Sequence, residues 1–359
     1  MKIILSANSH WNIYNFRIGL VKELVKSHEV YVLGSKDQTS HKLKKIGCKL
    51  FNVKIDHHGK SVKDDTRLFL QYLSILKKVR PDYYFGFTIK PNIYGSFACR
   101  ILNIKSISNI TGLGEIFINK GILENFVIFL YKLSVRYSKF VLFQNKEDIK
   151  YFKKKKIINN NYKIIPGSGI NLKKIKILKK KSINRIFTFL YVGRIIKEKG
   201  VLELIKAFCL LNKKFKNIQL ILVGKIDLTL KKQLNLKFCD NIKFYKFTNK
   251  ISKFYKKSDC FIMPSYREGL SRSILEAASY QMPILASDVP GCKELVFVGQ
   301  NGFLFKSRNI NSIFKCMIKL LSKNNRDIIN MGKKSRSIVE KKYEEKKVID
   351  VYKKIINEN

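Results

Sequence analysis

PSYREGLSRSILEAA, residues 264–278, is the stretch that decides the fold of this chain. The apolar run before it, residues 260–263, predicts a short buried strand, and Pro264-Ser265 marks the end of that strand. Gly269 permits a turn, and Ser271 is a suitable N-cap for a helix with good helix formers from Ser273 onward. We therefore expect a strand, a sharp loop and a helix whose unpaired N–H groups face the loop.

The predicted loop and helix combine hydrogen-bond donors with carboxylates. The N-terminus of a helix favours anions such as phosphate. Glu268 lies in the loop and Glu276 follows eight residues later on the helix, and carboxylates accept hydrogen bonds from the vicinal hydroxyls of sugars and riboses. Glu276 taken alone is equally well explained as an ordinary exposed helix residue. The segment indicates donors for a phosphate next to acceptors for sugar hydroxyls.

The chain is long enough for two domains. At 359 residues it exceeds the usual size of one hydrophobic core, and 45% hydrophobic residues suffice for two. The net charge of +46 comes mostly from Lys spread along the whole sequence, which fits a codon bias at least as well as a dedicated nucleic-acid surface. Either origin makes the surface attractive to phosphate and anionic lipid, by about 1 kcal/mol for each well-placed basic residue near a membrane.

The cysteines and the apolar runs indicate the compartment. Seven scattered cysteines form no Cys-x2-Cys pair, so we expect buried reduced thiols, a reducing cytosol, and neither a disulfide framework nor a zinc site. Residues 1–7 lead directly into a strand pattern and do not form a signal peptide. The longest apolar region, residues 122–133, is well below the ~20 residues that span a bilayer. The protein is expected to be soluble or peripheral.

Strand and helix patterns alternate along both halves of the chain. Near-continuous apolar strands separated by helices predict parallel sheets covered on both faces, so the fold class is α/β with two doubly wound, Rossmann-like domains. Such domains bind ligands beyond the carboxyl ends of their strands. The predicted strands are residues 2–7, 29–33, 49–55, 83–87, 106–110, 140–144 and 162–165, then 187–192, 219–223, 242–247, 260–263, 284–287 and 303–305.

A break in this alternation gives the domain boundary. Pro166-Gly167-Ser168-Gly169 interrupts the pattern, and the basic run 173–181 follows it. We therefore expect an N-terminal domain at residues 1–168 and a second domain at 169–335. Residues 336–359 are expected to form a helical C-terminal segment.

A second group of polar residues follows the first strand of the second half. In YVGRIIKEKG, residues 191–200, Arg194 and Lys199 lie beyond that strand, on the same rim as Glu268. Both can point at one diphosphate, Arg as a fork and Lys as a point charge. The alternative is that Arg194 and Lys199 have no functional role, because basic residues are common throughout this Lys-rich chain. Gly193 in the same loop is expected to take part in donor binding, and Gly224 and Phe247 after the next two strands are expected to line a nucleobase pocket.

These segments together resemble the retaining glycosyltransferases of family 4. The resemblance rests on Glu-x7-Glu inside residues 264–278, on PILASDVPG at 283–291, and on Asn301-Gly302-Phe303. It implies the GT-B fold, with two Rossmann-like domains facing each other and a last helix that crosses back to the first domain. It also implies transfer with retention of configuration and no metal.

The resemblance also gives the donor-side residues their roles. Glu276 is expected to hold the ribose and Glu268 the transferred sugar. Arg194 and Lys199 match the family's donor-phosphate pair, and they are expected to stabilise the departing diphosphate. The amides near Gly269, Leu270 and Ser271 are expected to contribute to the same stabilisation.

The acceptor residues are expected in the first domain. His10, in a loop after the first strand, either orients the acceptor hydroxyl, binds a phosphate, or is a structural loop histidine. Asn12 belongs to the same loop, residues 8–15, which replaces the glycine pair that is familiar in the family. Thr111, Gly112 and Gly114 follow the fifth strand and permit close approach of a ligand.

No metal or other cofactor is expected. The sequence has no Asp-x-Asp motif near either group of site residues, and Asp64-Asp65 lies before a helix. Asp56-His57-His58 is compatible with a metal site, but neighbouring side chains on an extended chain diverge, which argues against one.

Two features indicate a lipid-linked acceptor. Residues 121–137 form either a helix at a membrane interface or a core helix of the first domain. TGLGEIF, SGINLKKI and PSYREGLSRSILEA together resemble the subgroup that extends polyprenyl-diphosphate-linked oligosaccharides, such as bacterial N-acetylgalactosaminyltransferases. The resemblance implies transfer of a hexose or N-acetylhexosamine from a UDP-linked sugar to a polyprenyl-linked saccharide. It implies a cytoplasmic enzyme at the inner face of the cell membrane, on an anionic surface.

Two other functions stay open at this point. A nucleotide-sugar epimerase on the same fold would need acid and base groups at the sugar. A basic nucleic-acid-binding protein is supported only by the charge, because no compact binding motif or basic–aromatic pattern is present, so no nucleic acid is expected as a partner.

Overall fold

The computed structural model describes residues 1–56, 61–114, 121–177, 186–227, 230, 239, 241–248 and 250–358. The chain forms two compact units. The first unit comprises residues 1–168 together with 345–359, and the second comprises residues 169–344.

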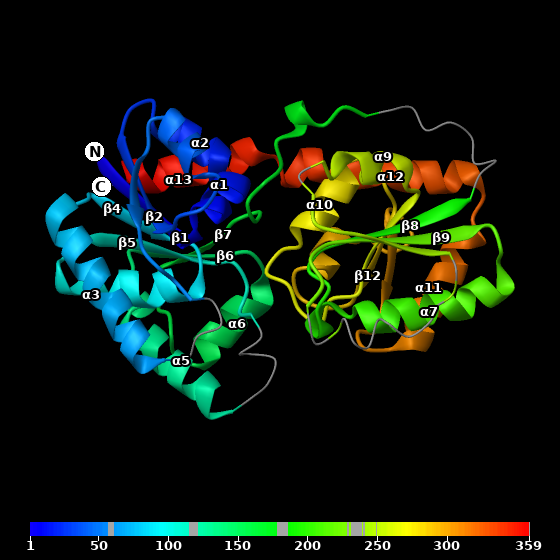
Figure 1. The fold of residues 1–359 in the computed structure, drawn as a ribbon, viewed down its shortest axis with the longest axis horizontal. Coiled ribbons are helices and arrows are strands. Elements are labelled where there is room, and N and C mark those ends of the chain that lie inside the picture. Colours follow the sequence, from blue (N-terminus) through cyan, green and yellow to red (C-terminus); the bar gives the residue numbers. More distant parts are fainter. Residues whose placement is uncertain are drawn as a thin grey trace. The chain divides into compact units, whose positions relative to one another are not determined.

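Within the described residues, the first unit is built on a seven-stranded parallel sheet in the order β3-β2-β1-β4-β5-β6-β7 (Figure 1). Every strand predicted for this half is present, with ends that differ by one to three residues. The strands are β1 (Lys2–Ser9), β2 (Glu29–Ser35), β3 (Lys49–Asn52), β4 (Tyr83–Gly86), β5 (Lys105–Ile110), β6 (Phe140–Phe143) and β7 (Tyr162–Ile164).

Helices cover both faces of this sheet because the side chains of each strand alternate between the faces. On β1, Ile3 and Leu5 pack with α1 and α13, whereas Ile4 packs with α3 and α4 on the other face. The helices are α1 (His10–Leu24), α2 (Ser40–Lys45), α3 (Val62–Val79), α4 (Ser96–Ile101), α5 (Ile122–Leu133), α6 (Lys146–Lys154) and α13 (Glu345–Asn357), with a π-helix at Pro91–Gly95 and a 3₁₀ turn at Val135–Tyr137.

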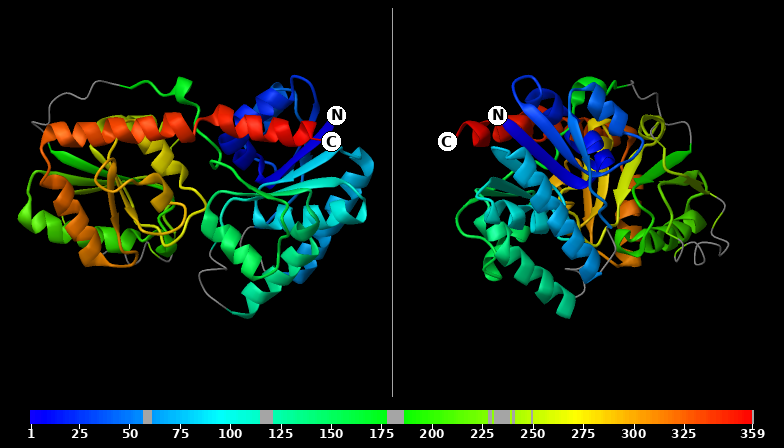
Figure 2. Two further views of the ribbon diagram at one scale, coloured as in Figure 1. Left: turned by 180° about the vertical axis from the view of Figure 1, so that it is seen from behind. Right: turned by 60° about the vertical axis from the view of Figure 1, so that its left-hand side comes forward.

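The last helix belongs to the first unit, as predicted. Figure 1 and Figure 2 show α13 alongside α1, and the buried ring of Tyr352 lies 5.5 Å from that of Phe85. The Tyr352 hydroxyl also hydrogen-bonds to the side chain of Asn109. The expected segment 336–359 is divided, however, because α12 (Asn325–Lys342) ends in the second unit before α13 begins.

The described part of the second unit repeats the design with a six-stranded parallel sheet, ordered β10-β9-β8-β11-β12-β13. Figure 2 shows helices on both faces, with α7 and α11 on one and α12 on the other. The strands are β8 (Phe187–Val192), β9 (Ile218–Val223), β10 (Ile242–Tyr245), β11 (Cys260–Met263), β12 (Ile284–Ser287) and β13 (Gly302–Phe305). The helices are α7 (Val201–Lys214), α9 (Ser252–Lys257), α10 (Arg272–Ser279), α11 (Ile310–Leu321) and α12, with 3₁₀ turns at Leu172–Lys174, Lys197–Lys199 and Lys293–Leu295.

One predicted loop is wrong. Residues 8–15 are not a loop, because β1 continues to Ser9 and α1 begins at His10. Ser9 has an extended backbone and its hydroxyl accepts a hydrogen bond from the amide of Asn12 at 3.3 Å, so it is the N-cap of α1. Strand and helix follow each other without the expected connecting loop.

Among the described residues, every helix is too short or too polar to cross a lipid bilayer.

Candidate functional site

The sheet order places two loops of the second unit at a topological switch point. Strand β8 lies between β9 and β11, so the chain leaves β8 toward one side of the sheet and leaves β11 toward the other. Ligands of doubly wound sheets bind in the crevice that forms where such connections diverge. The loop after β8 contains residues 193–200, and the loop after β11 contains residues 264–271. These are the two segments that the sequence assigned to the donor.

Two predicted site residues from these loops are in contact. Nζ of Lys199 forms an ion pair with Oε1 of Glu268, and the two side chains are only 18% and 16% exposed. The Ser265 hydroxyl donates a second hydrogen bond to the same carboxylate oxygen at 2.7 Å. Lys199, expected at the diphosphate, and Glu268, expected at the sugar, therefore lie side by side, and their ion pair holds both side chains in position.

Arg194 lies in the same neighbourhood, although its own side chain is exposed. The buried Tyr191 hydroxyl donates a hydrogen bond to the backbone carbonyl of Arg194 at 2.6 Å. The pKa of Tyr191 is well above its ordinary value, mainly because of burial and also because the negative charge of Glu268 raises it. The positive charge of Arg194 acts in the opposite direction and lowers this pKa by a smaller amount. The Tyr191 hydroxyl is thus bonded to the loop of Arg194 and lies within the electrostatic reach of Glu268 on the other loop.

The loop that carries Glu268 is held by the segment after β12. The Glu268 amide donates to the carbonyl of Pro290 at 3.0 Å, and the Ser271 amide donates to the carbonyl of Gly291 at 2.8 Å. Gly291 has φ +79°, and a Cβ there would lie 2.5 Å from the Glu268 carbonyl carbon. No larger residue fits at 291 without moving Glu268.

These bonds correct one expectation about the loop amides. The N–H of Ser271 was expected to face a departing phosphate, but it is already used by Gly291. Ser271 is the N-cap residue of α10, as predicted, and the helix begins at Arg272. The amides left without an acceptor inside α10 are those of its first turn, and these are the donors that the helix end offers to an anion.

Glu276 is held from two sides. The Tyr255 hydroxyl donates to its Oε2 at 3.1 Å, and the Arg272 Nε donates to its Oε1 at 3.0 Å. Burial first, and the Glu276 carboxylate second, raise the pKa of Tyr255 well above its ordinary value, so the phenol stays protonated and donates. The side chain of Glu276 is 28% exposed, so it can still meet a ligand.

The sequence analysis missed Tyr255 as a functional residue. It lies 21 positions from Glu276, on α9, and nothing in a short motif connects the two. Ser265 belongs to the motif at residues 264–278, but its residue type alone indicates no functional role. The only available signal for it was its position three residues before Glu268 on the same turn.

Gly193 and the two residues predicted for the nucleobase pocket, Gly224 and Phe247, follow three neighbouring strands. The Gly193 amide donates to the Val223 carbonyl at 3.0 Å, and a Cβ at Gly224 would lie 1.8 Å from the Gly193 carbonyl oxygen. Close approach of these two backbones therefore requires glycine at 224. Phe247, two residues after β10, is 55% exposed at the same edge of the sheet.

His10 is a buried residue of α1 rather than an exposed loop residue. Its Nδ1 is 2.8 Å from the Ser40 hydroxyl and its Nε2 is 3.3 Å from the Phe51 carbonyl oxygen. Burial lowers its pKa below the ordinary histidine value, outweighing the hydrogen bond to Phe51 and the charge of Asp37. A direct contact with a substrate would break bonds that hold α1, so we omit His10 from the catalytic residues that we propose.

The other predicted acceptor residues lie at the carboxyl edge of the first sheet. Asn12 is in the first turn of α1, directly after β1. The Thr111 hydroxyl donates to the Phe87 carbonyl at 3.1 Å. Gly112 and Gly114 have φ values of +124° and +72°, which favour glycine. Asn12 follows β1 and the other three residues follow β5, and these two strands lie on either side of β4 in the sheet.

Some of the sequence-based hypotheses fall outside the described residues. These are His57 and His58 of the weighed metal site, Glu115 of the TGLGE segment, and residues 178–181 of the basic run. Among the residues that the structure does describe, no three His, Cys, Asp or Glu side chains group closely enough to hold a metal ion.

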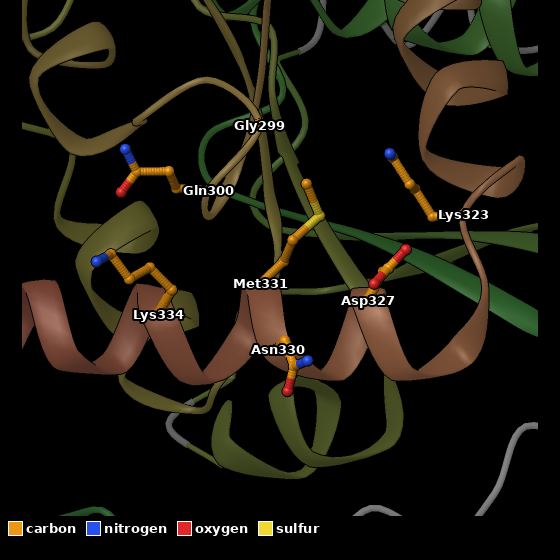
Figure 3. Close-up of a pocket in the computed structure, with 7 residues that line it drawn as sticks. All are labelled: Gly299, Gln300, Lys323, Asp327, Asn330, Met331 and Lys334. Atoms are coloured by element: carbon orange, nitrogen blue, oxygen red, sulfur yellow. The ribbon is translucent and has the colours of Figure 1, made fainter.

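A separate pocket of about 420 Å³ lies on the opposite edge of the second sheet from the donor loops. Figure 3 shows Met331 rising from α12 toward the turn that carries Gly299, just before β13 begins. None of the predicted site residues lines it. The lining residues are Gly299, Gln300, Lys323, Asp327, Asn330, Met331 and Lys334.

The two halves of the chain match two family models. Residues 173–344 match the glycosyl transferases group 1, and residues 2–145 match the glycosyl transferase 4-like family. A relative from Campylobacter jejuni, the N,N'-diacetylbacillosaminyl-diphospho-undecaprenol alpha-1,3-N-acetylgalactosaminyltransferase, is 26% identical over 93% of this chain and 92% of its own length. The UDP-Gal:alpha-D-GlcNAc-diphosphoundecaprenol alpha-1,3-galactosyltransferase of Escherichia coli is 29% identical over 41% of each chain.

Solved structures share the fold. HepE from Anabaena, determined in complex with UDP and glucose, covers the whole of both chains with a TM-score of 0.80 at 16% identity. WaaG, a glycosyltransferase involved in lipopolysaccharide biosynthesis, covers 99% of this chain and 100% of its own with a TM-score of 0.77 at 14% identity. The chain is therefore a glycosyltransferase of the GT-B fold, with a glycosyl transferase 4-like half followed by a group 1 half.

Proposed function

We propose that the enzyme transfers a hexose or N-acetylhexosamine from a UDP-linked sugar to a lipid-linked saccharide, with retention of configuration. The observation that carries the proposal is the contact between Lys199 and Glu268 at the switch point between β8 and β11. This contact joins a cation for the diphosphate to a carboxylate for the sugar, in the half that matches the group 1 model. We propose residues 169–335 as the donor-binding domain and residues 1–168 as the acceptor-binding domain.

The proposed chemistry depends on the charges that develop on the diphosphate and on the sugar during transfer. As the bond between the sugar C1 and the diphosphate oxygen breaks, negative charge builds on the diphosphate and the sugar becomes oxocarbenium-like. Lys199, Arg194 and the first-turn amides of α10 would stabilise the negative charge, and one such preorganised donor typically contributes about 3 kcal/mol. The acceptor hydroxyl oxygen forms the new bond to C1 from the same side, and its proton passes to the departing diphosphate. Glu268 holds the sugar hydroxyls, and Glu276 holds the ribose.

The lipid-linked acceptor is proposed from the relatives. The C. jejuni and E. coli proteins are both named for acceptors joined to undecaprenol through a diphosphate, and the first of them covers nearly the whole chain. An acceptor of this kind lies in a membrane, so the enzyme must meet a lipid surface. We therefore place it at the cytoplasmic face of the cell membrane, where a net charge of +46 attracts anionic lipid.

Helix α5 of the first unit offers the surface for that contact. One side of α5 packs in the core through Val127, Ile128 and Tyr131. The other side exposes Ile122, Phe126 and Phe129, which are 91%, 50% and 55% exposed. Residues 122, 126 and 129 follow helical spacing, so they form one apolar stripe. The helix thus packs in the core on one side, as one of the two alternatives predicts, and exposes an apolar stripe on the other. We propose that this stripe inserts among lipid headgroups.

A transfer assay tests the function. The purified enzyme would be incubated with radiolabelled UDP-sugars, with and without a polyprenyl-linked saccharide in lipid extract, and label would be followed into the lipid fraction. Transfer by the wild type, with at least a hundredfold loss in Glu268→Gln, is the expected result. Interconversion of free UDP-sugars without transfer would replace the proposal by an epimerase. A product with inverted anomeric configuration would refute the retaining step alone.

A further inference from the structure

Two cysteines of the second unit lie in direct contact. Cys209 is on α7, and Cys239 is in the connection between β9 and β10. Their Sγ atoms are 2.7 Å apart, although 30 positions separate them in the sequence. Neither residue is in a disulfide in this structure. The contact is unrelated to the donor loops and has no role in the chemistry proposed above.

These two cysteines also differ from the others in exposure. Cys209 and Cys239 are partly exposed, whereas Cys48, Cys99, Cys260, Cys292 and Cys316 are buried. Burial raises the pKa of Cys48 and of Cys316 to about 11. It raises the pKa of Cys99 and Cys292 further still. Because the thiolate is the reactive form, the buried cysteines are poor nucleophiles, and the contacting pair is the place where an oxidant can react.

We propose that Cys209 and Cys239 are an oxidation-sensitive pair that forms a disulfide with a peroxide as the oxidant. One thiolate attacks a peroxide oxygen, the O–O bond breaks, and a sulfenic acid forms while the leaving hydroxide takes up a proton to give water. The second thiolate then attacks the sulfenic sulfur, the S–S bond forms as the S–O bond breaks, and the departing hydroxide takes up the proton released by the second thiol to give a second water. The two thiols lose two electrons and two protons, and one hydrogen peroxide is reduced to two waters.

The bond would fasten α7 to the connection between β9 and β10. Helix α7 begins directly after Lys199 and Gly200, so the fastened helix is the one that follows the donor loop. A cross-link between residues 30 positions apart restricts the unfolded chain and stabilises the folded one. The oxidised second unit should therefore melt a few degrees higher than the reduced one.

Thiol counting after peroxide treatment tests the proposal on the full chain. With one equivalent of hydrogen peroxide, the number of titratable thiols in denaturant should fall from seven to five. Peptide mapping should place the bond between Cys209 and Cys239, and the rise in melting temperature should reverse with a reductant. Cys209→Ser and Cys239→Ser should each form no internal disulfide and lose at most one thiol, as the sulfenic acid, whereas the control Cys316→Ala should still lose two.

Three results would overturn the proposal. The first is a wild type that keeps seven thiols after treatment. The second is a mapped bond that joins other cysteines or two chains. The third is a Cys209→Ser variant that still loses two thiols. Because peptide mapping uses the wild-type protein, a variant that failed to fold would not obscure the answer.

Discussion

Lys199 and Glu268 form an ion pair across 69 positions of sequence, and both side chains are more than four-fifths buried. In the absence of donor the two charges neutralise each other, and Ser265 completes the arrangement with a hydrogen bond to Glu268. A nucleotide sugar offers each of them a new partner, a diphosphate for Lys199 and hydroxyls for Glu268. We propose that the pair is a donor-binding site whose charges are already held in position before the substrate arrives.

Lys199→Ala should lower kcat for sugar transfer by about a hundredfold or more, because a charge that faces the departing diphosphate is lost. The melting temperature should fall as well, because the mostly buried Glu268 carboxylate loses its countercharge and keeps the hydrogen bond from Ser265. Lys197→Ala, two positions earlier in the same turn and exposed, is the matched control and should retain activity. Steady-state kinetics and a thermal melt measure both effects, and full activity of Lys199→Ala would mean that the site is misplaced.

Gly291→Ala should damage the site through the backbone of Glu268. Gly291 and Gly299 both have φ +79°, so alanine at either position costs about 1 kcal/mol of strain. An added Cβ meets Glu268 at 2.5 Å in the first case and nothing within 4 Å in the second. Both variants should therefore lose some stability, but only Gly291→Ala should lose transfer activity, by tenfold or more. Equal activities of the two variants in the kinetic assay would contradict this account of the loop.

Tyr255→Phe should weaken donor binding by removing one of the two hydrogen bonds that hold Glu276. A lost bond to a charged group is worth about 1.5–3 kcal/mol, so the KM for the donor should rise roughly tenfold while kcat changes less. Tyr280→Phe is the control, because the Tyr280 ring stacks on Tyr255 at 5.3 Å and its hydroxyl is not the donor to Glu276 in this structure. If both variants changed KM equally, ring packing rather than the hydrogen bond would position Glu276.

The buried His10 predicts a loss of stability in mild acid. Its folded-state pKa lies below the ordinary value of 6.5, so the unfolded chain binds more protons in that range, and stability falls as the pH falls through and below 6.5. His28, whose pKa is lowered mainly by burial as well, adds a slope of the same sign. Thermal melts between pH 7.5 and about 5 should show a flatter dependence for His10→Gln than for the wild type. An unchanged slope would show that His10 is not the buried neutral group described here.

The apolar stripe on α5 predicts binding to anionic membranes. The wild type should sediment with phosphatidylglycerol vesicles and much less with phosphatidylcholine vesicles, because the basic surface contributes to attraction. Replacing Phe126 and Phe129 by Ser should reduce sedimentation severalfold without loss of folding, since both are about half exposed. Phe215→Ser, an exposed phenylalanine of the second unit, is the control. Equal sedimentation of the double variant and the control would remove α5 from the membrane contact.

The sequence predicted the sheets well because buried parallel strands leave a strong local signal. Residues 187–192 and 260–263 are predicted with the bounds that β8 and β11 have, and the loops that follow them contain the residues of the proposed site. Where signals are weak the prediction failed. The polar residues after Ser9 are typical of a loop, so the sequence does not reveal that a capped helix starts there. The burial of His10 is also not predictable from local sequence, because its partners Ser40 and Phe51 lie in distant segments. The bond between Tyr255 and Glu276 is likewise a product of the folded chain.

A crystal structure with bound UDP is the measurement that tests the central claim most directly. The account predicts the diphosphate beside Lys199 and Arg194, the ribose hydroxyls on Glu276, and the Lys199–Glu268 ion pair opened toward the ligand. Nucleotide bound elsewhere, for example in the pocket lined by Lys323 and Lys334, with that ion pair intact, would contradict the donor site described here.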